Sequence, residues 1–181
     1  IHIDIDPAEI GKNKRPDVPI VGDVKNVLKE LVPKIKERKR DEWVSKVLEW
    51  KKEYPVMYKA VPEDKLVPQE VLEELDKIIK GNAIITTDVG QHQMWAAQYL
   101  SYENPDHMIT SGGAGTMGFG MPAAVGAQIA MPDKKVISIS GDGGFQMTFQ
   151  ELMMLKQYNL PVKVIILNNS FLGMVRQWQE I

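Results

Sequence analysis

Apolar runs and helix-like patterns alternate along the second half of the chain. Largely apolar runs occupy residues 83–88, 136–140 and 162–167, and glycine or asparagine follows each of them closely. Runs of this length between turn residues are typical of strands buried in a parallel sheet. Residues 121–130 and 148–158 carry small or apolar side chains at helical spacing. The pattern predicts an α/β fold, with a parallel sheet flanked by helices on both faces.

The first part of the chain has a weaker pattern. Residues 1–5 alternate as a half-buried strand does, residues 20–23 predict a second short strand with a turn, and an amphipathic helix follows. Two strands and one helix bury too little apolar surface to form a core alone. Residues 41–54 predict another helix, which presents Trp43 and Trp50.

A further helix marks the start of a second domain. Pro68 suits the first position of this helix, and Gly81 suits its end. Its apolar stripe consists of Val71, Leu72, Leu75, Ile78 and Ile79. We therefore expect the end of one domain at residues 1–35, a charged linker helix and extended connector at 36–66, and the second domain at 67–181.

Length and composition limit the class of protein. A chain of 181 residues buries one good core with a smaller appendage. A net charge of -2 gives no general attraction to nucleic acid or to an anionic membrane, and the basic stretch at 34–40 is interpreted as a solvated helix end. No apolar run is as long as a membrane span. The absence of cysteine excludes a disulfide scaffold and is compatible with the cytoplasm, the location that we expect.

Both ends of the sequence fall within predicted elements. The first residue is not Met, and residues 1–5 begin as a strand already under way. Residues 178–181 stop inside a predicted helix. We therefore expect a piece of a longer polypeptide, with the second domain truncated at its C-terminus.

Asp142 and Asn169 each follow a predicted strand. Asp142 stands in a Gly-Asp-Gly motif after the run at 136–140, and Asn169 ends an Asn pair after the run at 162–167. A right-handed crossover brings the carboxyl ends of parallel strands to one edge of the sheet, so the two side chains are expected to meet. A carboxylate, an amide oxygen and a backbone carbonyl suit Mg2+, whose other ligands are usually phosphate oxygens and water. The motif predicts a site for magnesium and diphosphate.

Two further glycine-containing segments border the same edge. The turn at 89–92 leads from the strand at 83–88 into a predicted helix at 93–100, and N–H groups at a helix start can bind an anion. The loop at 111–120 contains glycines at the spacing of a dinucleotide-binding fingerprint. That fingerprint requires a firm strand before the loop, and here only residues 108–110 precede it. A dinucleotide site is therefore disfavoured.

The Gly-Asp-Gly motif at Asp142, followed one helix and one strand later by Asn168 and Asn169, resembles the metal-binding motif of thiamine diphosphate enzymes. The surrounding residues are similar to those of the acetolactate synthase (acetohydroxyacid synthase) catalytic subunit family. The resemblance implies the thiamine diphosphate-binding fold, with Mg2+ held by Asp142, Asn169 and the backbone carbonyl of Phe171. It implies contacts between thiamine diphosphate and Val89, Gly90, Gln91, His92, Gly115, Met117, Gly143, Gly144, Met147, Met174 and Val175.

The same resemblance gives Trp178 a role in selecting the second keto acid, from a lid helix that also carries Met174 and Val175. These three residues also repeat at helical spacing. The alternative is therefore that they form an ordinary core stripe.

Residues 1–35 resemble the end of the middle domain of this family, which holds FAD in acetolactate synthases. The resemblance implies that FAD borders Asp4, Ile5, Glu9, Ile10, Asp23 and Val24. A carboxylate at the end of a strand suits a ribose hydroxyl. The alternative is that these acids only cap turns and helices.

The activity implied by the resemblance belongs to branched-chain amino acid biosynthesis. Pyruvate would be condensed with pyruvate or 2-ketobutyrate, with loss of CO2, to give 2-acetolactate or 2-aceto-2-hydroxybutyrate. The family also implies a homodimer or tetramer with active sites at the subunit interface, and a small regulatory subunit. Alternatives are another thiamine diphosphate enzyme, namely a pyruvate oxidase, glyoxylate carboligase or 2-keto acid decarboxylase, or a non-catalytic α/β module that binds a phosphate ligand.

In this family, the glutamate that activates the cofactor lies in an N-terminal domain of the neighbouring subunit, which no part of this sequence resembles. We therefore assign no catalytic residue here, and expect these 181 residues alone to bind diphosphate and Mg2+ weakly and to form no product. Incubation of the purified 181-residue chain with pyruvate, thiamine diphosphate and Mg2+ checks this expectation. Detection of acetolactate would contradict it.

Overall fold

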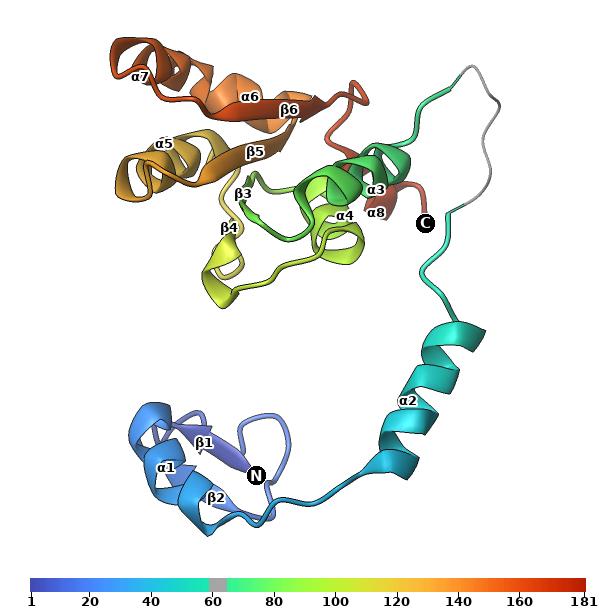
Figure 1. Cartoon of the computed structure of the whole chain (residues 1–181), viewed down its shortest axis with the longest axis vertical. Helices are drawn as coiled ribbons and strands as arrows, with labels where there is room; N and C mark the ends of the chain where they lie inside the picture. Colours follow the sequence, from blue (N-terminus) through green and yellow to red (C-terminus); the bar gives the residue numbers. More distant parts are fainter. Residues whose placement is uncertain (59–64) are drawn as a thin grey trace. The chain divides into compact units, whose positions relative to one another are not determined.

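The computed structural model describes residues 1–58 and 65–181, which form two compact units, Ile1–Pro55 and Val56–Ile181 (Figure 1). Part of the predicted connector, residues 59–64, lies outside the described residues. The predicted division at residues 35 and 66 stays a prediction. Within the described part of the chain, no helix has the length and apolar content that crossing a bilayer requires.

The first unit is a small arrangement of two strands and helices. Its elements are β1 (His2–Asp4), β2 (Pro19–Val21), α1 (Val24–Leu31), the 3-10 helix η1 (Val32–Lys34) and α2 (Asp41–Glu53). The strands pair in parallel, with His2 opposite Pro19. Trp43 and Trp50 pack edge to face on α2, with ring centroids 5.7 Å apart. Neither α1 nor α2 has a buried residue, as expected for a unit too small to form a core.

The second unit is a parallel sheet between two layers of helices. The strand order is β4-β3-β5-β6, and the strands are β3 (Ala83–Thr87), β4 (Met108–Thr110), β5 (Lys135–Gly141) and β6 (Lys163–Leu167). The α-helices are α3 (Pro68–Ile79), α4 (Gln91–Tyr99), α5 (Gly120–Ala130), α6 (Asp142–Thr148), α7 (Leu152–Gln157) and α8 (Gly173–Gln179), with 3-10 helices η2 (Pro105–His107) and η3 (Phe149–Glu151). The predicted α/β class is confirmed.

Alternate residues of the central strands pack against opposite layers. Ile85 of β3 belongs to a core cluster with Leu72 of α3 and Ala96 of α4. Its neighbour Ile84 belongs to a second cluster, with Ala124 of α5. This alternation follows from the two-residue period of a strand. Both faces of the sheet are therefore covered, which explains why all five residues of β3 are buried.

The helix predicted at 148–158 begins earlier, and its course is less regular. α6 starts at Asp142, so Gly141 ends β5, and Asp142 and Gly143 already belong to the first turn of a helix. The partial positive charge at a helix N-terminus favours an acid in this turn. η3 then separates α6 from α7. The helix predicted from Gln93 also begins earlier, at Gln91, directly after Gly90.

β6 is not the buried strand that its apolar sequence predicts. It lies at the edge of the sheet among the described residues and pairs only with β5 there. Ile166 is 42% exposed as a result. The apolar pattern of a strand does not reveal how many neighbouring strands it has, so this edge position could not be predicted from the sequence.

The apolar stripe of α3 contains both buried and exposed members, which makes a matched pair of substitutions. Leu72 is fully buried, whereas Ile78 is 75% exposed. We expect Leu72→Ala to lower the free energy of unfolding by about 2–5 kcal/mol, because it leaves a cavity in the core. Ile78→Ala is expected to change it by about 0.5 kcal/mol or less. Urea unfolding monitored by circular dichroism measures both, and equal losses would show that the α3 face is wrongly assigned.

Candidate functional site

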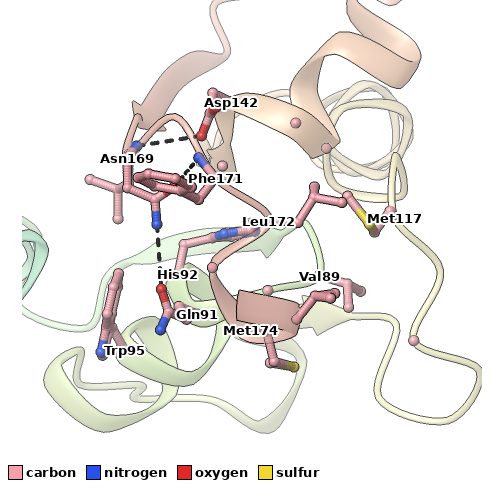
Figure 2. A pocket seen from close by; sticks show the side chains of 18 of the residues that line it. Val89, Gln91, His92, Trp95, Met117, Asp142, Asn169, Phe171, Leu172 and Met174 are labelled. Atoms are coloured by element: carbon pink, nitrogen blue, oxygen red, sulfur yellow. Dashed lines mark hydrogen bonds between the residues drawn. The ribbon is translucent and has the colours of Figure 1, made fainter. Parts of the chain in front are cut away.

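A cavity of about 320 Å³ lies where the carboxyl ends of β3, β5 and β6 meet the loops that follow them (Figure 2). Most of the residues that the sequence singles out in this unit line it: Val89, Gly90, Gln91, His92, Gly115, Met117, Asp142, Gly143, Gly144, Asn169, Phe171, Met174, Val175 and Trp178. They come from four segments that are far apart in the sequence. The sheet topology therefore assembles the predicted site at one edge.

Two groups of predicted residues lie elsewhere. Met147 is 52% exposed and does not line the cavity. The residues expected to border FAD belong to the first unit: Asp4, Ile5, Glu9, Ile10, Asp23 and Val24. The roles expected for these residues stay predictions.

Asp142 and Asn169 meet because β5 and β6 are neighbours. Gly141 pairs with Leu167 at the end of the two strands, and each strand then leads to its polar residue. The backbone N–H of Asn169 donates to Oδ1 of Asp142 at 3.4 Å. The Asn169 side-chain oxygen accepts from the N–H of Phe171 at 3.0 Å, as Figure 2 shows. Carboxylate and amide oxygens can accept more than one contact each, so both retain capacity for a cation.

The oxygen atoms of Asp142 and Asn169 suit a hard cation whose remaining coordination positions are filled by phosphate oxygens and water. In the part of the chain that the structure describes, no group of three or more His, Cys, Asp or Glu side chains is placed to hold a metal ion. A protein-only cage is therefore not formed there. One carboxylate with one amide oxygen fits Mg2+, which usually keeps several positions for phosphate oxygens and water.

Gly144 allows close packing at the start of α6. A Cβ atom on Gly144 would overlap the carboxylate of Asp88, which is buried beneath this turn. Gly143 lies beside it in the cavity wall. After Asp142, the first turn of α6 therefore has two successive residues without side chains, as close approach of an anion to a helix N-terminus requires.

His92 is buried at the base of the cavity. Its side chain packs against Gly90 and Gly141, where added Cβ atoms would lie 2.7 Å and 2.9 Å from the ring. Burial lowers the pKa of His92, although the nearby Asp88 and Asp142 oppose this shift. Its Nε2 has no hydrogen-bond partner. A neutral imidazole with an unpartnered nitrogen is suited to a hydrogen bond with a bound ligand.

Gln91 connects three segments around the cavity. Its side-chain oxygen accepts from Nδ2 of Asn169 at 3.3 Å, as Figure 2 shows. Its side-chain nitrogen donates to the amide oxygen of Gln177 on α8 at 3.2 Å. The first residue of α4 is thus linked both to the loop after β6 and to α8 beside the cavity.

α8 does not form a core stripe. Met174, Val175 and Trp178 all line the cavity, and no residue of α8 is buried. Val175 is 52% exposed and Trp178 is 75% exposed. These exposures show that the three side chains do not form a buried core stripe, and the role expected for a lid helix stays a prediction.

The sequence predicted no contact with the cofactor for several residues in or near the site. Trp95 and Leu172 line the cavity. Trp95 lies one helical turn after His92, a spacing that was visible in the sequence. Asp88 is 1% exposed and is bound to the backbone of two loops, which the sequence did not show.

Comparison with protein families gives two matches along the chain. Residues 88–181 match the family described as "Thiamine pyrophosphate enzyme, C-terminal TPP binding domain". Residues 1–31 match "Thiamine pyrophosphate enzyme, central domain". The first match contains the whole set of cavity residues, and the expectation of thiamine diphosphate is thereby confirmed.

Several similar proteins are acetolactate synthases. The large subunit from Lactococcus lactis is 51% identical over 99% of this chain, which covers 31% of that protein. The large subunit from Cyanidium caldarium is 49% identical over 99% of this chain and is covered to 32%. Acetolactate synthase 2, chloroplastic, from Zea mays is 50% identical over 99% of this chain and is covered to 29%. The chain thus spans about a third of the length of these relatives. With the family match over residues 88–181, the chain belongs to the thiamine pyrophosphate enzymes.

Proposed function

We propose that this chain carries the Mg2+ and diphosphate part of the active site of an acetolactate synthase. The reaction would condense pyruvate with a second 2-keto acid, with loss of CO2, to give 2-acetolactate or 2-aceto-2-hydroxybutyrate. The contact between Asp142 and Asn169 in the cavity wall carries the proposal. The acetolactate synthase relatives favour this reaction over those of other thiamine diphosphate enzymes.

The metal ligands would be Asp142, Asn169 and the backbone carbonyl of Phe171. The first two are in contact, and the third belongs to the same loop as Asn169. The diphosphate would lie against the N–H groups of Gly143 and Gly144, where the helix N-terminus favours negative charge. Mg2+ would balance the charge between the carboxylate and the diphosphate oxygens.

Other cavity residues would orient the cofactor. Gln91 would donate a hydrogen bond to the diphosphate from the start of α4, and His92 would lie against the cofactor beside it. The carbonyl of Gly115 would accept from the aminopyrimidine, while Met117 supports the bent molecule. Met174 and Val175 would cover its rings and exclude water. When bound, thiamine diphosphate supplies the electron sink that decarboxylation and carbon–carbon bond formation require.

Trp178 would contact the second keto acid. It lies on α8, lines the cavity and is 75% exposed, so its indole presents a large apolar surface to incoming substrate. The two candidate acceptors, pyruvate with its methyl group and 2-ketobutyrate with its ethyl group, differ by one methylene. An aromatic wall can favour the larger group through the extra apolar contact.

The first unit would border FAD in the intact protein, and its match to a central domain of the family supports this. Oδ1 of Asp4 accepts from the N–H of Asp6, and Oδ1 of Asp23 accepts from the N–H of Asn26 and caps α1. These are the capping contacts of the alternative interpretation. The second oxygen of each carboxylate would serve a ribose hydroxyl.

The proposal includes a homodimer or tetramer, a small regulatory subunit and a cytoplasmic location. Exposed apolar side chains near α7 support a subunit interface in this unit. Phe149 is 55% exposed and Met153 is 69% exposed. Burying such side chains against another subunit removes apolar surface from water.

Removal of the Asp142 carboxylate tests the metal site. We expect Asp142→Ala to abolish Mg2+-dependent binding of thiamine diphosphate, because the site loses its charged ligand. Isothermal titration calorimetry with Mg2+ or with EDTA measures this. Asp133→Ala is the control, since Asp133 is exposed between α5 and β5 and does not line the cavity. Unchanged binding by the Asp142 variant would refute the proposed site.

Product analysis tests the reaction and the role of Trp178. The complete polypeptide, supplied with pyruvate and 2-ketobutyrate, is expected to form 2-acetolactate and 2-aceto-2-hydroxybutyrate. Trp178→Leu is expected to lower the relative yield of the latter about tenfold, because a methylene contact contributes roughly 1–3 kcal/mol. Gln179→Ala, on the same helix but outside the cavity, serves as the control. Acetaldehyde or acetyl phosphate as the main product would instead indicate a decarboxylase or an oxidase.

A further inference from the structure

Asp88 is a buried acid whose side chain binds backbone groups. It follows β3, and its side chain is 1% exposed. Oδ1 accepts from the N–H groups of Val89 at 2.8 Å and Gly118 at 3.1 Å, and Oδ2 accepts from Gly120 at 3.1 Å. Its own N–H donates to the carbonyl of Ile139 on β5 at 2.9 Å. The carboxylate is thus fixed to the central strands of the sheet and satisfied by charge-assisted hydrogen bonds.

This carboxylate touches three segments that line the cavity. Val89 begins the turn that leads into α4. Gly118 and Gly120 end the glycine-rich loop. The third segment is the first turn of α6, where the carboxylate packs against Gly144 so closely that a Cβ atom would overlap Oδ1. One side chain therefore sets the spacing between all three.

Both backbone polar groups of Gly118, its N–H and its carbonyl, form hydrogen bonds with side chains of other segments. Asp88 accepts from its N–H, and the hydroxyl of Thr148, at the end of α6, donates to its carbonyl at 3.0 Å. Gly118 has φ of 85°, a left-handed conformation that other residues rarely adopt. The preceding residue, Met117, reaches into the cavity, with Cε 3.9 Å from the Cβ position of Gly143. The position of Met117 therefore depends on this double anchor.

We propose that Asp88 is a positioning residue for the cofactor site, whose carboxylate fixes the distance between the glycine-rich loop and the first turn of α6. The proposal rests on the function proposed above. Asp88 does not line the cavity, so it acts through Met117, Gly143 and Gly144. An incorrect spacing would separate the surface that supports the cofactor rings from the turn that binds its diphosphate.

Asp88→Asn tests the proposal with little change in shape. In the asparagine, an amide nitrogen replaces one carboxylate oxygen and cannot accept a hydrogen bond. It would therefore face a backbone N–H group of the loop, so that two donors meet. In the complete polypeptide at fixed Mg2+, we expect the thiamine diphosphate concentration for half-maximal activity to rise about tenfold or more, as for loss of a charge-assisted hydrogen bond. The kcat at saturating cofactor is expected to fall by about threefold or less, since the loop regains its position when the cofactor is bound.

Two further variants separate positioning from general stability. Asp76→Asn removes a carboxylate that accepts from the N–H and hydroxyl of Ser101, away from the cavity. It is expected to lower the melting temperature and to leave half-saturation by cofactor unchanged. Thr148→Val removes the other anchor of Gly118 and is expected to raise half-saturation in the same direction as Asp88→Asn. It carries the test if Asp88→Asn does not fold.

The outcomes distinguish this proposal from the function on which it rests. If thiamine diphosphate with Mg2+ neither binds nor activates the wild-type protein, both are overturned. If the wild type responds and the folded Asp88 and Thr148 variants share its half-saturation within about twofold, only the positioning role is overturned. Raised half-saturation in both variants, with Asp76→Asn unchanged, supports the positioning role.

Discussion

The pairing of β5 with β6 is the constraint on which the rest of the site depends. Hydrogen bonds between the parallel strands β5 and β6 fix Gly141 opposite Leu167, and both strands end at the same edge of the sheet. Asp142 and Asn169 are therefore neighbours although α6, η3, α7 and β6 lie between them in the sequence. The glycine-rich loop, the turn before α4 and helix α8 converge on this pair to enclose the cavity.

Buried polar groups hold the loops of the site to the sheet. Asp88 binds the turn and the glycine-rich loop, while the hydroxyl of Thr86 donates to the carbonyl of Gly120 at 2.9 Å. A buried carboxylate or hydroxyl without partners would be costly, so these bonds also favour one loop conformation over others. The apolar layers stabilise the sheet, whereas the polar anchors specify the cavity.

Strong local signals made much of this arrangement predictable. Pro68 and Gly81 bound α3 as the sequence indicates, and the three apolar runs correctly predict β3, β5 and β6 of the sheet. The rule that a right-handed crossover places the ends of parallel strands at one edge was sufficient to predict that Asp142 and Asn169 meet. The predictions were wrong where a short sequence motif suggested one structure but contacts with distant residues favoured another. Glycine favours a turn by propensity, yet Asp142 and Gly143 of the Gly-Asp-Gly motif belong to α6, where Gly144 packs against Asp88 and the helix N-terminal charge favours an acid.

By itself, the sequence determined the strands, most helix boundaries and the identity of the polar residues at the strand ends, because these depend on the period and propensity of short segments. Only the tertiary structure decided that β6 lies at the edge of the sheet among the described residues, that Met147 lies outside the cavity, and that Asp88 joins the segments around the cavity. These features depend on contacts between residues distant in the chain. The pattern of a short segment cannot predict such contacts, because the burial and partners of a side chain depend on the other segments that pack against it.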